Sequence, residues 1–177
     1  DRGRAREHLL RAFERGTPRE KSTALELLGA SGVSEDLPLL VRTLRGGGDV
    51  LLRDGAAAGL GSWEDRGDLE KPCGVKGDRG AEITPFDALV EAASGGDWVV
   101  ASIAVESLGK TAPGGVAPAL VRVYDAHGGY NDGDRKLAVV EAIGAIGSRS
   151  DDKEIEELAL PAFLARAATD PDARVAA

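Results

Sequence analysis

The sequence predicts an all-α protein, a right-handed α-solenoid of stacked antiparallel helix pairs with about four and a half repeats. An eight-residue pattern that opens a helix recurs five times, and an apolar stretch with helical spacing precedes each copy. Alternation of apolar and polar residues, which is typical of strands, is nearly absent. A helical hairpin of this size buries its apolar face only against the next hairpin, so the recurrence indicates a repeat array. The five copies begin at Thr17, Asp49, Asp97, Asp132 and Asp170.

The second helix of each pair is expected to start at these residues. Thr and Asp accept hydrogen bonds from the free amides of a first helical turn. Pro follows Thr17 and Asp170, where a missing N–H group has no cost. Near the end of each complete copy an apolar residue precedes a glycine, which predicts that the helix stops there. These glycines are Gly29, Gly61, Gly109 and Gly144.

The first helix of each pair is predicted from the preceding apolar stretches. These begin at Leu9, Leu39, Phe86, Leu120 and Leu160. The chain 1–177 is therefore expected to form a single solenoid domain. Its repeats are predicted at about 4–32, 36–62, 85–112 and 116–148, with a truncated one at 157–177. The first residue is not Met, and Ala177 follows soon after the last cap, so the sequence is expected to be a piece of a longer chain.

An insertion at 62–84 lengthens the second unit. Long loops in compact arrays are functional or disordered, and Trp63 favours an ordered loop packed on one rim. Trp63 and Cys73 are thus candidates for partner contact. Lys71 and Lys76 could lower the pKa of the Cys73 thiol, although an incidental exposed thiol is the simpler interpretation.

These features resemble the HEAT-like repeats, in the short bacterial form related to the repeats of phycobilisome lyases. The resemblance covers nearly all 177 residues and rests on the Asp cap, the base four residues later, as at Arg53, and the segment 139–147, Val-Val-Glu-Ala-Ile-Gly-Ala-Ile-Gly. Three residues depart from the family pattern. Ala101 replaces the base of the third copy, and Glu20 and Arg135 occupy positions that are usually apolar.

The repeated base has two interpretations. As a ladder along the solenoid, these side chains would bind an anionic ligand. The resemblance implies instead that each base reaches the capping Asp of a neighbouring repeat, which is favoured because such a charge-assisted bond also sets the stacking angle. The four bases are Lys21, Arg53, Lys136 and Arg174.

The candidate binding surface lies on the opposite side of the second helices. If Ala24, Ala56, Ala104 and Val139 point inward, residues two positions later lie away from the core. Those residues are Glu26, Ala58, Glu106 and Glu141, with Ser22, Asp54 and Ser102 nearby. In the family the second helices line the concave surface, so an acidic stripe is expected there, with Trp98 as its exposed aromatic anchor. A merely solvated helix face is the equally open alternative.

Composition and motifs argue against several function classes. The net charge of −8 argues against a nucleic-acid partner, and no apolar run is long enough to span a membrane. One cysteine and the distant His8 and His127 cannot readily form a zinc site. The stretch Asn131–Asp134 lacks the spacing of a calcium loop and is interpreted as turn and cap chemistry. No catalytic centre, metal or cofactor is expected.

The sequence therefore predicts a non-catalytic protein-interaction module or scaffold within a larger chain or complex, whose partner presents a basic contact surface. Two alternatives stay open. The segment could be an auxiliary domain of an enzyme whose catalytic part lies elsewhere, or it could bind a chromophore or another small molecule, as lyase-related HEAT proteins do. A single cysteine leaves the compartment open, with the cytoplasm favoured over export.

Overall fold

The computed structural model describes residues 2–78, 80–126, 133–149, 160–171 and 175. Within these ranges the regular structure is helical, and the one strand-like pairing is an isolated bridge between Lys76 and Glu82. The prediction of an all-α protein is confirmed.

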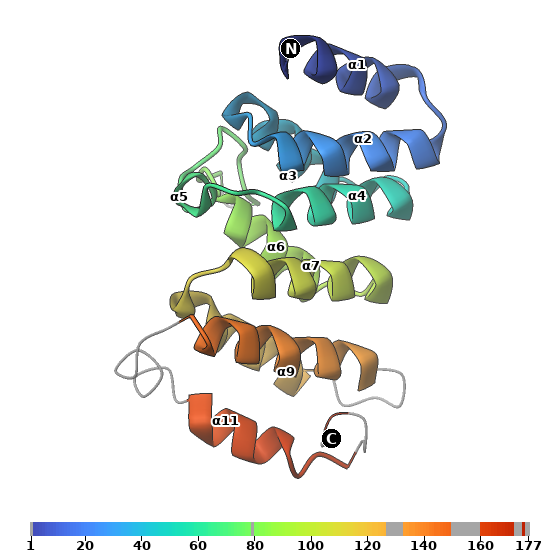
Figure 1. The fold of residues 1–177 in the computed structure, drawn as a ribbon. Helices are drawn as coiled ribbons and strands as arrows, with labels where there is room; N and C mark the ends of the chain where they lie inside the picture. Colours follow the sequence, from blue (N-terminus) through green and yellow to red (C-terminus); the bar gives the residue numbers. More distant parts are fainter. Residues whose placement is uncertain (1, 79, 127–132, 150–159, 172–174, 176–177) are drawn as a thin grey trace.

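Most of the helices form antiparallel pairs that stack in chain order from α1 to α11 (Figure 1). The first helices of the pairs are α1 Arg2–Arg15, α3 Leu37–Arg45, α6 Pro85–Ala93 and α8 Ala117–Ala126. The second helices are α2 Pro18–Ser31, α4 Val50–Gly61, α7 Trp98–Thr111 and α9 Gly133–Gly147. The remaining elements are α5 Arg66–Leu69, α11 Leu160–Ala167 and the 3₁₀ turns Ser34–Asp36 and Gly114–Val116.

Side-chain caps fix where the second helices begin. Thr17 forms a capping box in which its backbone N–H donates to Glu20 Oε2 over 2.7 Å. Asp49 Oδ1 accepts from the Leu51 amide at 2.9 Å, and Asp97 Oδ1 accepts from the Val99 amide at 3.1 Å. The predicted caps at Thr17, Asp49 and Asp97 are confirmed. Asp132 lies outside the described residues.

The second helices form one continuous row in which each contacts the next. These are the most extensive helix contacts of the described chain. Glycine permits the approach: a Cβ atom on Gly29 would lie 2.1 Å from the backbone oxygen of Gly59, and one on Gly109 would lie 2.8 Å from Ala142 Cα. The backbones of neighbouring second helices therefore touch.

Three of the four predicted glycine helix stops are wrong, and only Gly61 lies at the end of its helix. Helix α2 continues through Gly29 and ends before Gly32, whose φ of 66° is the left-handed conformation. Helices α7 and α9 likewise continue past Gly109 and Gly144. Gly61 is the last residue of α4, but a Cβ atom there would lie 2.4 Å from Ser107 Oγ. Glycine suits both a helix stop and a close helix contact, and Gly29, Gly61 and Gly109 serve the second purpose.

The core lies between the two rows of helices. Ala24, Ala56, Ala104 and Val139 are buried, so the inward positions assumed from the sequence are the observed ones. Large aliphatic side chains fill the space around them. They include Leu25, Leu28, Leu40, Leu60, Leu89, Leu108, Leu120 and Ile143.

The first helices lie less tightly against one another than the second helices do. Between α6 and α8 there is a hollow of about 460 Å³. Phe86, Val90 and Val116 contribute apolar lining, and Asp87 and Arg122 contribute charged groups.

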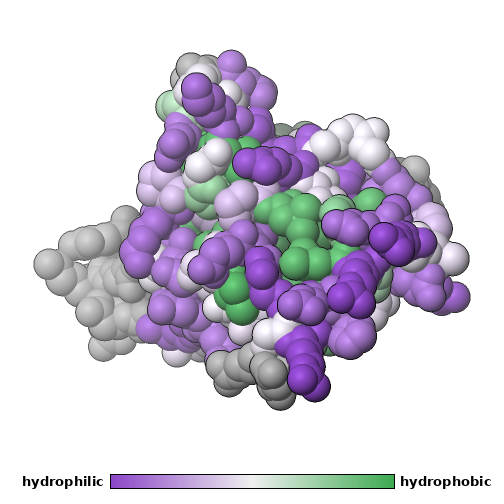
Figure 2. Space-filling view, turned by 90° about the horizontal axis from the view of Figure 1, so that it is seen from above, coloured by the Kyte–Doolittle hydropathy of each residue, from purple (hydrophilic) through white to green (hydrophobic). Residues whose placement is uncertain are grey.

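The end of the stack that α1 forms exposes an apolar residue of α2. Leu27 lies ten residues after Thr17, the N-cap of α2, and is 48% exposed. The residues at the same position of the later units are Gly59, Ser107 and Ala142, which are small and lie against the preceding second helix. Figure 2 looks onto this end and shows an apolar area bordered by hydrophilic side chains.

The described part of the insertion packs against the array. Trp63 is only 3% exposed, and Leu69 and Val75 are also buried. The guanidinium of Arg45 binds Asp78 at 2.8 Å, Glu91 at 2.6 Å and the backbone oxygen of Lys76 at 2.8 Å. The expectation that Trp63 contacts a partner is wrong, because its indole is part of the core.

Two glycine substitutions should have opposite effects on stability. Gly29→Ala places a methyl group against the Gly59 backbone and should lower the free energy of unfolding by about 1–3 kcal/mol. Gly144→Ala is the matched control, because nothing lies within 4 Å of its Cβ position. It should raise that free energy by up to about 1 kcal/mol through helix propensity. Denaturant unfolding measures both, and equal effects would refute the helix contact at Gly29.

Candidate functional site

Four carboxylates lie on the second helices, on the side away from the core. Glu26 of α2, Glu106 of α7 and Glu141 of α9 are exposed, and Asp54 of α4 is half-buried. The charges of Glu26 and Glu106 both raise the pKa of Asp54, which shows that these groups lie near one another. We call Glu26, Asp54, Glu106 and Glu141 the acidic face.

Asp54 is the least compensated member of the acidic face. Its Oδ1 atom is buried and has no hydrogen-bond partner among the residues that the structure describes. Burial raises the pKa of this carboxyl, and the charges of Glu26, Asp97 and Glu106 raise it further. The adjacent Arg53 does not neutralise it, because its guanidinium is directed to Leu44 O at 3.1 Å and to Asp97 at 4.0 Å.

This ionisable oxygen therefore lies in a negative environment, and no described residue supplies a counter-charge. The equivalent residues of the neighbouring helices are Ser22 and Ser102, which are neutral. Ser102 satisfies its hydroxyl by donating to Trp98 O at 2.9 Å. Asp54 is thus the charged residue at a position where both neighbouring second helices carry serine.

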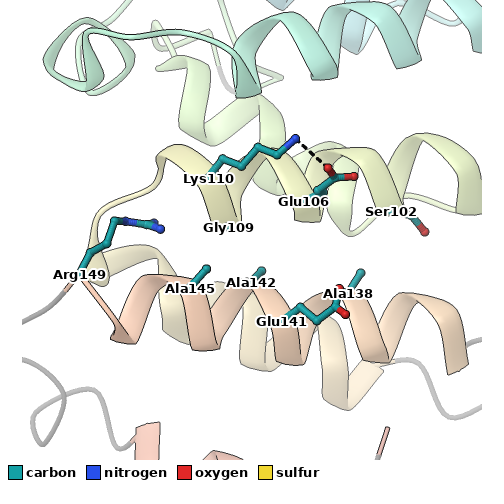
Figure 3. Close-up of a pocket in the computed structure, with 9 residues that line it drawn as sticks. All are labelled: Ser102, Glu106, Gly109, Lys110, Ala138, Glu141, Ala142, Ala145 and Arg149. Carbon is teal, nitrogen blue, oxygen red and sulfur yellow. Dashed lines mark ion pairs between the residues drawn. The ribbon is translucent and has the colours of Figure 1, made fainter. Parts of the chain in front are cut away.

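A groove of about 340 Å³ lies between α7 and α9 beside these carboxylates (Figure 3). Its floor consists of small residues, Gly109, Ala138, Ala142 and Ala145, and its rim brings together Ser102, Glu106 and Glu141. Three residues of the predicted surface therefore line this groove.

The rim of the groove also carries two cations that the sequence prediction omitted, Lys110 and Arg149. Lys110 Nζ lies 2.7 Å from Glu106 Oε1, so Glu106 is largely compensated (Figure 3). The i,i+4 spacing of these residues was a readable signal for the pair. Glu141 makes no ion pair within the described part of the chain.

Trp98 is 61% exposed at the start of α7. Its spacing of four and eight residues from Ser102 and Glu106 puts all three on one side of the helix. Val50 and Leu51, at the start of the neighbouring α4, are also exposed. An apolar area therefore borders the acidic face, and the sequence analysis identified only its aromatic member.

The repeated bases contact the caps of following units. Arg53 Nη1 lies 4.0 Å from Asp97 Oδ2, and Lys136 Nζ lies 2.9 Å from Asp170 Oδ2. Lys21 makes no ion pair within the described ranges, and Arg174 lies outside them. The contacts of Arg53 and Lys136 are those that the family resemblance implies, and they join adjacent units.

The second of these contacts belongs to a larger cluster. The Tyr124 hydroxyl also donates to Asp170 Oδ2. Burial, together with this hydrogen bond, raises the pKa of Tyr124 to about 12. Tyr124 packs edge-on against Phe163, so α8 and α11 are linked here by polar and aromatic contacts.

Cys73 does not have the environment of a reactive thiol. Its side chain is half-buried, and burial raises the pKa of the thiol above its ordinary value. The suggestion that Lys71 and Lys76 lower this pKa is wrong, because desolvation outweighs nearby charge.

The described ranges contain neither a metal-binding cluster nor a membrane-spanning helix. No group of three or more His, Cys, Asp or Glu side chains there is arranged to hold a metal ion. None of the helices there combines the length and the apolar character needed to cross a bilayer. His127 and Asn131–Asp132 fall outside the described residues.

No protein-family model matches this sequence, and no curated protein matches it significantly.

Replacing Asp54 by Ser should stabilise the protein at neutral pH. Because the pKa of Asp54 is raised in the folded protein, its ionisation opposes folding. Below the ordinary pKa of 3.8 the carboxyl is protonated in both the folded and the unfolded state, so it costs no stability. The cost grows as the pH rises from there through the folded-state pKa. Asp54→Ser should raise the free energy of unfolding by on the order of 0.5 kcal/mol at neutral pH, a small value because the side chain is partly solvated.

The same experiment contains its own controls. The difference between wild type and Asp54→Ser should narrow as the pH is lowered toward about 4. The converse change, Ser102→Asp, adds a carboxylate beside the acidic face and should lower stability at neutral pH. Denaturant unfolding across pH measures all three proteins, and a pH-independent difference would contradict the assigned cause.

Proposed function

We propose that this chain is a protein-interaction module that binds a basic segment of a partner through the acidic face. The observation that carries the proposal is the buried, unpaired Oδ1 of Asp54 amid Glu26, Asp97 and Glu106. A lysine or arginine of a partner bound at the acidic face supplies the missing counter-charge beside this carboxylate.

The proposed architecture is a right-handed HEAT-like solenoid with the second helices on its concave side. The stacked pairs, the repeated caps and the row of touching second helices support it. A concave surface of this kind collects equivalent residues of successive units into one extended binding surface. Scaffolding within a larger chain or complex follows from such a surface without any catalytic group.

The partner segment also carries apolar side chains. Trp98 is exposed beside the acidic face, and exposed Trp residues are often dominant contacts in interfaces. Val50 and Leu51 extend the apolar area along the neighbouring helix. The partner is therefore a basic segment that also carries apolar side chains.

Small-molecule binding has less support. The groove between α7 and α9 lies at the low end of the volumes of ligand pockets, and its floor is made of Gly and Ala without aromatic lining. The auxiliary-domain alternative uses the same acidic face, with the catalytic part of its own complex as the partner.

A blocked peptide that combines leucine and lysine provides a defined probe. It should bind, and the affinity should fall as salt rises. Glu141→Lys should reduce the affinity several-fold, mainly through slower association. Glu106→Lys should have a smaller effect, because Lys110 already neutralises Glu106. Trp98→Ala should act mainly by faster dissociation. Surface plasmon resonance separates these rates.

Two controls accompany this measurement. A peptide of leucine and glutamate with the same spacing should not bind. Glu70→Lys makes the same charge change at an exposed residue of the insertion and should leave the affinity unchanged. Equal binding of both peptides, or equal effects of Glu70→Lys and Glu141→Lys, would refute the acidic face as the binding surface.

A further inference from the structure

Three cations from three elements gather at the C-terminal end of α7. They are Arg66 of α5, Lys110 of α7 and Arg149, which follows α9. Arg66 Nη2 donates to the backbone oxygen of Lys110 at 3.3 Å, and Arg149 Nη2 donates to that of Ala112 at 3.3 Å. Both guanidiniums therefore approach the same helix end.

Two of these cations have no carboxylate partner within the described part of the chain. Lys110 is paired with Glu106, but the only side-chain hydrogen bonds of Arg66 and Arg149 there go to backbone oxygens. A helix C-terminus offers only a partial negative charge. Burial lowers the pKa of Arg149, and the nearby charge of Arg66 lowers it further. Among the described residues, Arg149 thus lines this end of the groove without a carboxylate partner, and Arg66 lies nearby.

The groove between α7 and α9 therefore has two ends of opposite charge. Figure 3 shows Arg149 and Lys110 toward one end, and Glu141 and Ser102 toward the other. Glu141 and Arg149 are separated by eight residues of α9 and its immediate end, or about 12 Å at the helical rise. Ala142 and Ala145 line the groove between them with small side chains.

We propose that this groove binds an extended peptide segment that presents a lysine or arginine to Glu141 and an aspartate or glutamate side chain to Arg66 and Arg149. An extended chain advances about 3.3 Å per residue, so the two charged residues are separated by about three to four positions. The inference rests on the proposed function and adds the acidic residue and its spacing. Arginine suits this role because its planar group binds carboxylates in a bidentate manner.

Selection from a random peptide library tests both the charge and the spacing. The peptides are displayed between fixed linkers, so that they carry no terminal carboxylate near the groove. Peptides selected on the wild-type protein should combine a basic residue with an acidic one about three to four positions away. On the Arg66→Ala, Arg149→Ala double variant the acidic preference should disappear and the basic preference should remain. Arg122→Ala, an exposed arginine of α8, is the matched control and should select as wild type does.

A selected peptide then allows a direct measurement. Replacing its acidic residue by the amide should weaken binding to the wild-type protein by at least about five-fold, and should change binding to the double variant little. Thermal melts establish that the double variant is folded. An acidic preference that survives on the double variant, or no acidic preference on the wild type, would overturn this inference alone.

The remaining outcomes are equally distinct. If the selected peptides also lack a basic preference, the proposed function fails with the inference. If inorganic phosphate displaces the acidic peptide and its amide counterpart equally, the arginines form a simple anion site, and the peptide inference is overturned.

Discussion

Close contact between the backbones of consecutive second helices is the constraint on which the other features depend. At Gly29 and Gly59 the separation leaves no room for a side chain. Ser107 adds a hydrogen bond to Ala57 O at 2.9 Å across the next contact. Any residue with a larger side chain at these positions would push the helices apart and change the orientation of every unit beyond it.

The same contact produces the electrostatics of the exposed side. When second helices touch, residues at equal distances from their caps lie close together, so carboxylates of different units influence one another. Asp54 shows the result, because groups on α2 and α7 both raise its pKa. Serine stands at the equivalent position of both neighbouring helices, so the packing of the second helices does not require a charge there.

Local signals in the sequence predicted much of this arrangement. The caps at Thr17, Asp49 and Asp97 and the inward alanines were readable because capping and helical periodicity act within a few residues. The helix stops predicted at Gly29, Gly109 and Gly144 were wrong, because glycine occurs at helix ends and also inside helices, where at Gly29 and Gly109 it allows a close approach. The burial of Trp63 and the role of Arg45 depend on contacts between distant segments, such as Arg45 with Asp78, which no local pattern encodes.

The hollow between α6 and α8 has a mechanical consequence. The row of second helices is already in backbone contact and resists compression, whereas the first helices are separated by unfilled space about Phe86 and Val116. When the stack bends, the spacing between the second helices should therefore stay nearly constant. The spacing between the first helices should increase or decrease. The distances between carboxylates of the acidic face would change least in such a motion. The carboxylates of the acidic face would therefore keep their relative positions while the first helices move.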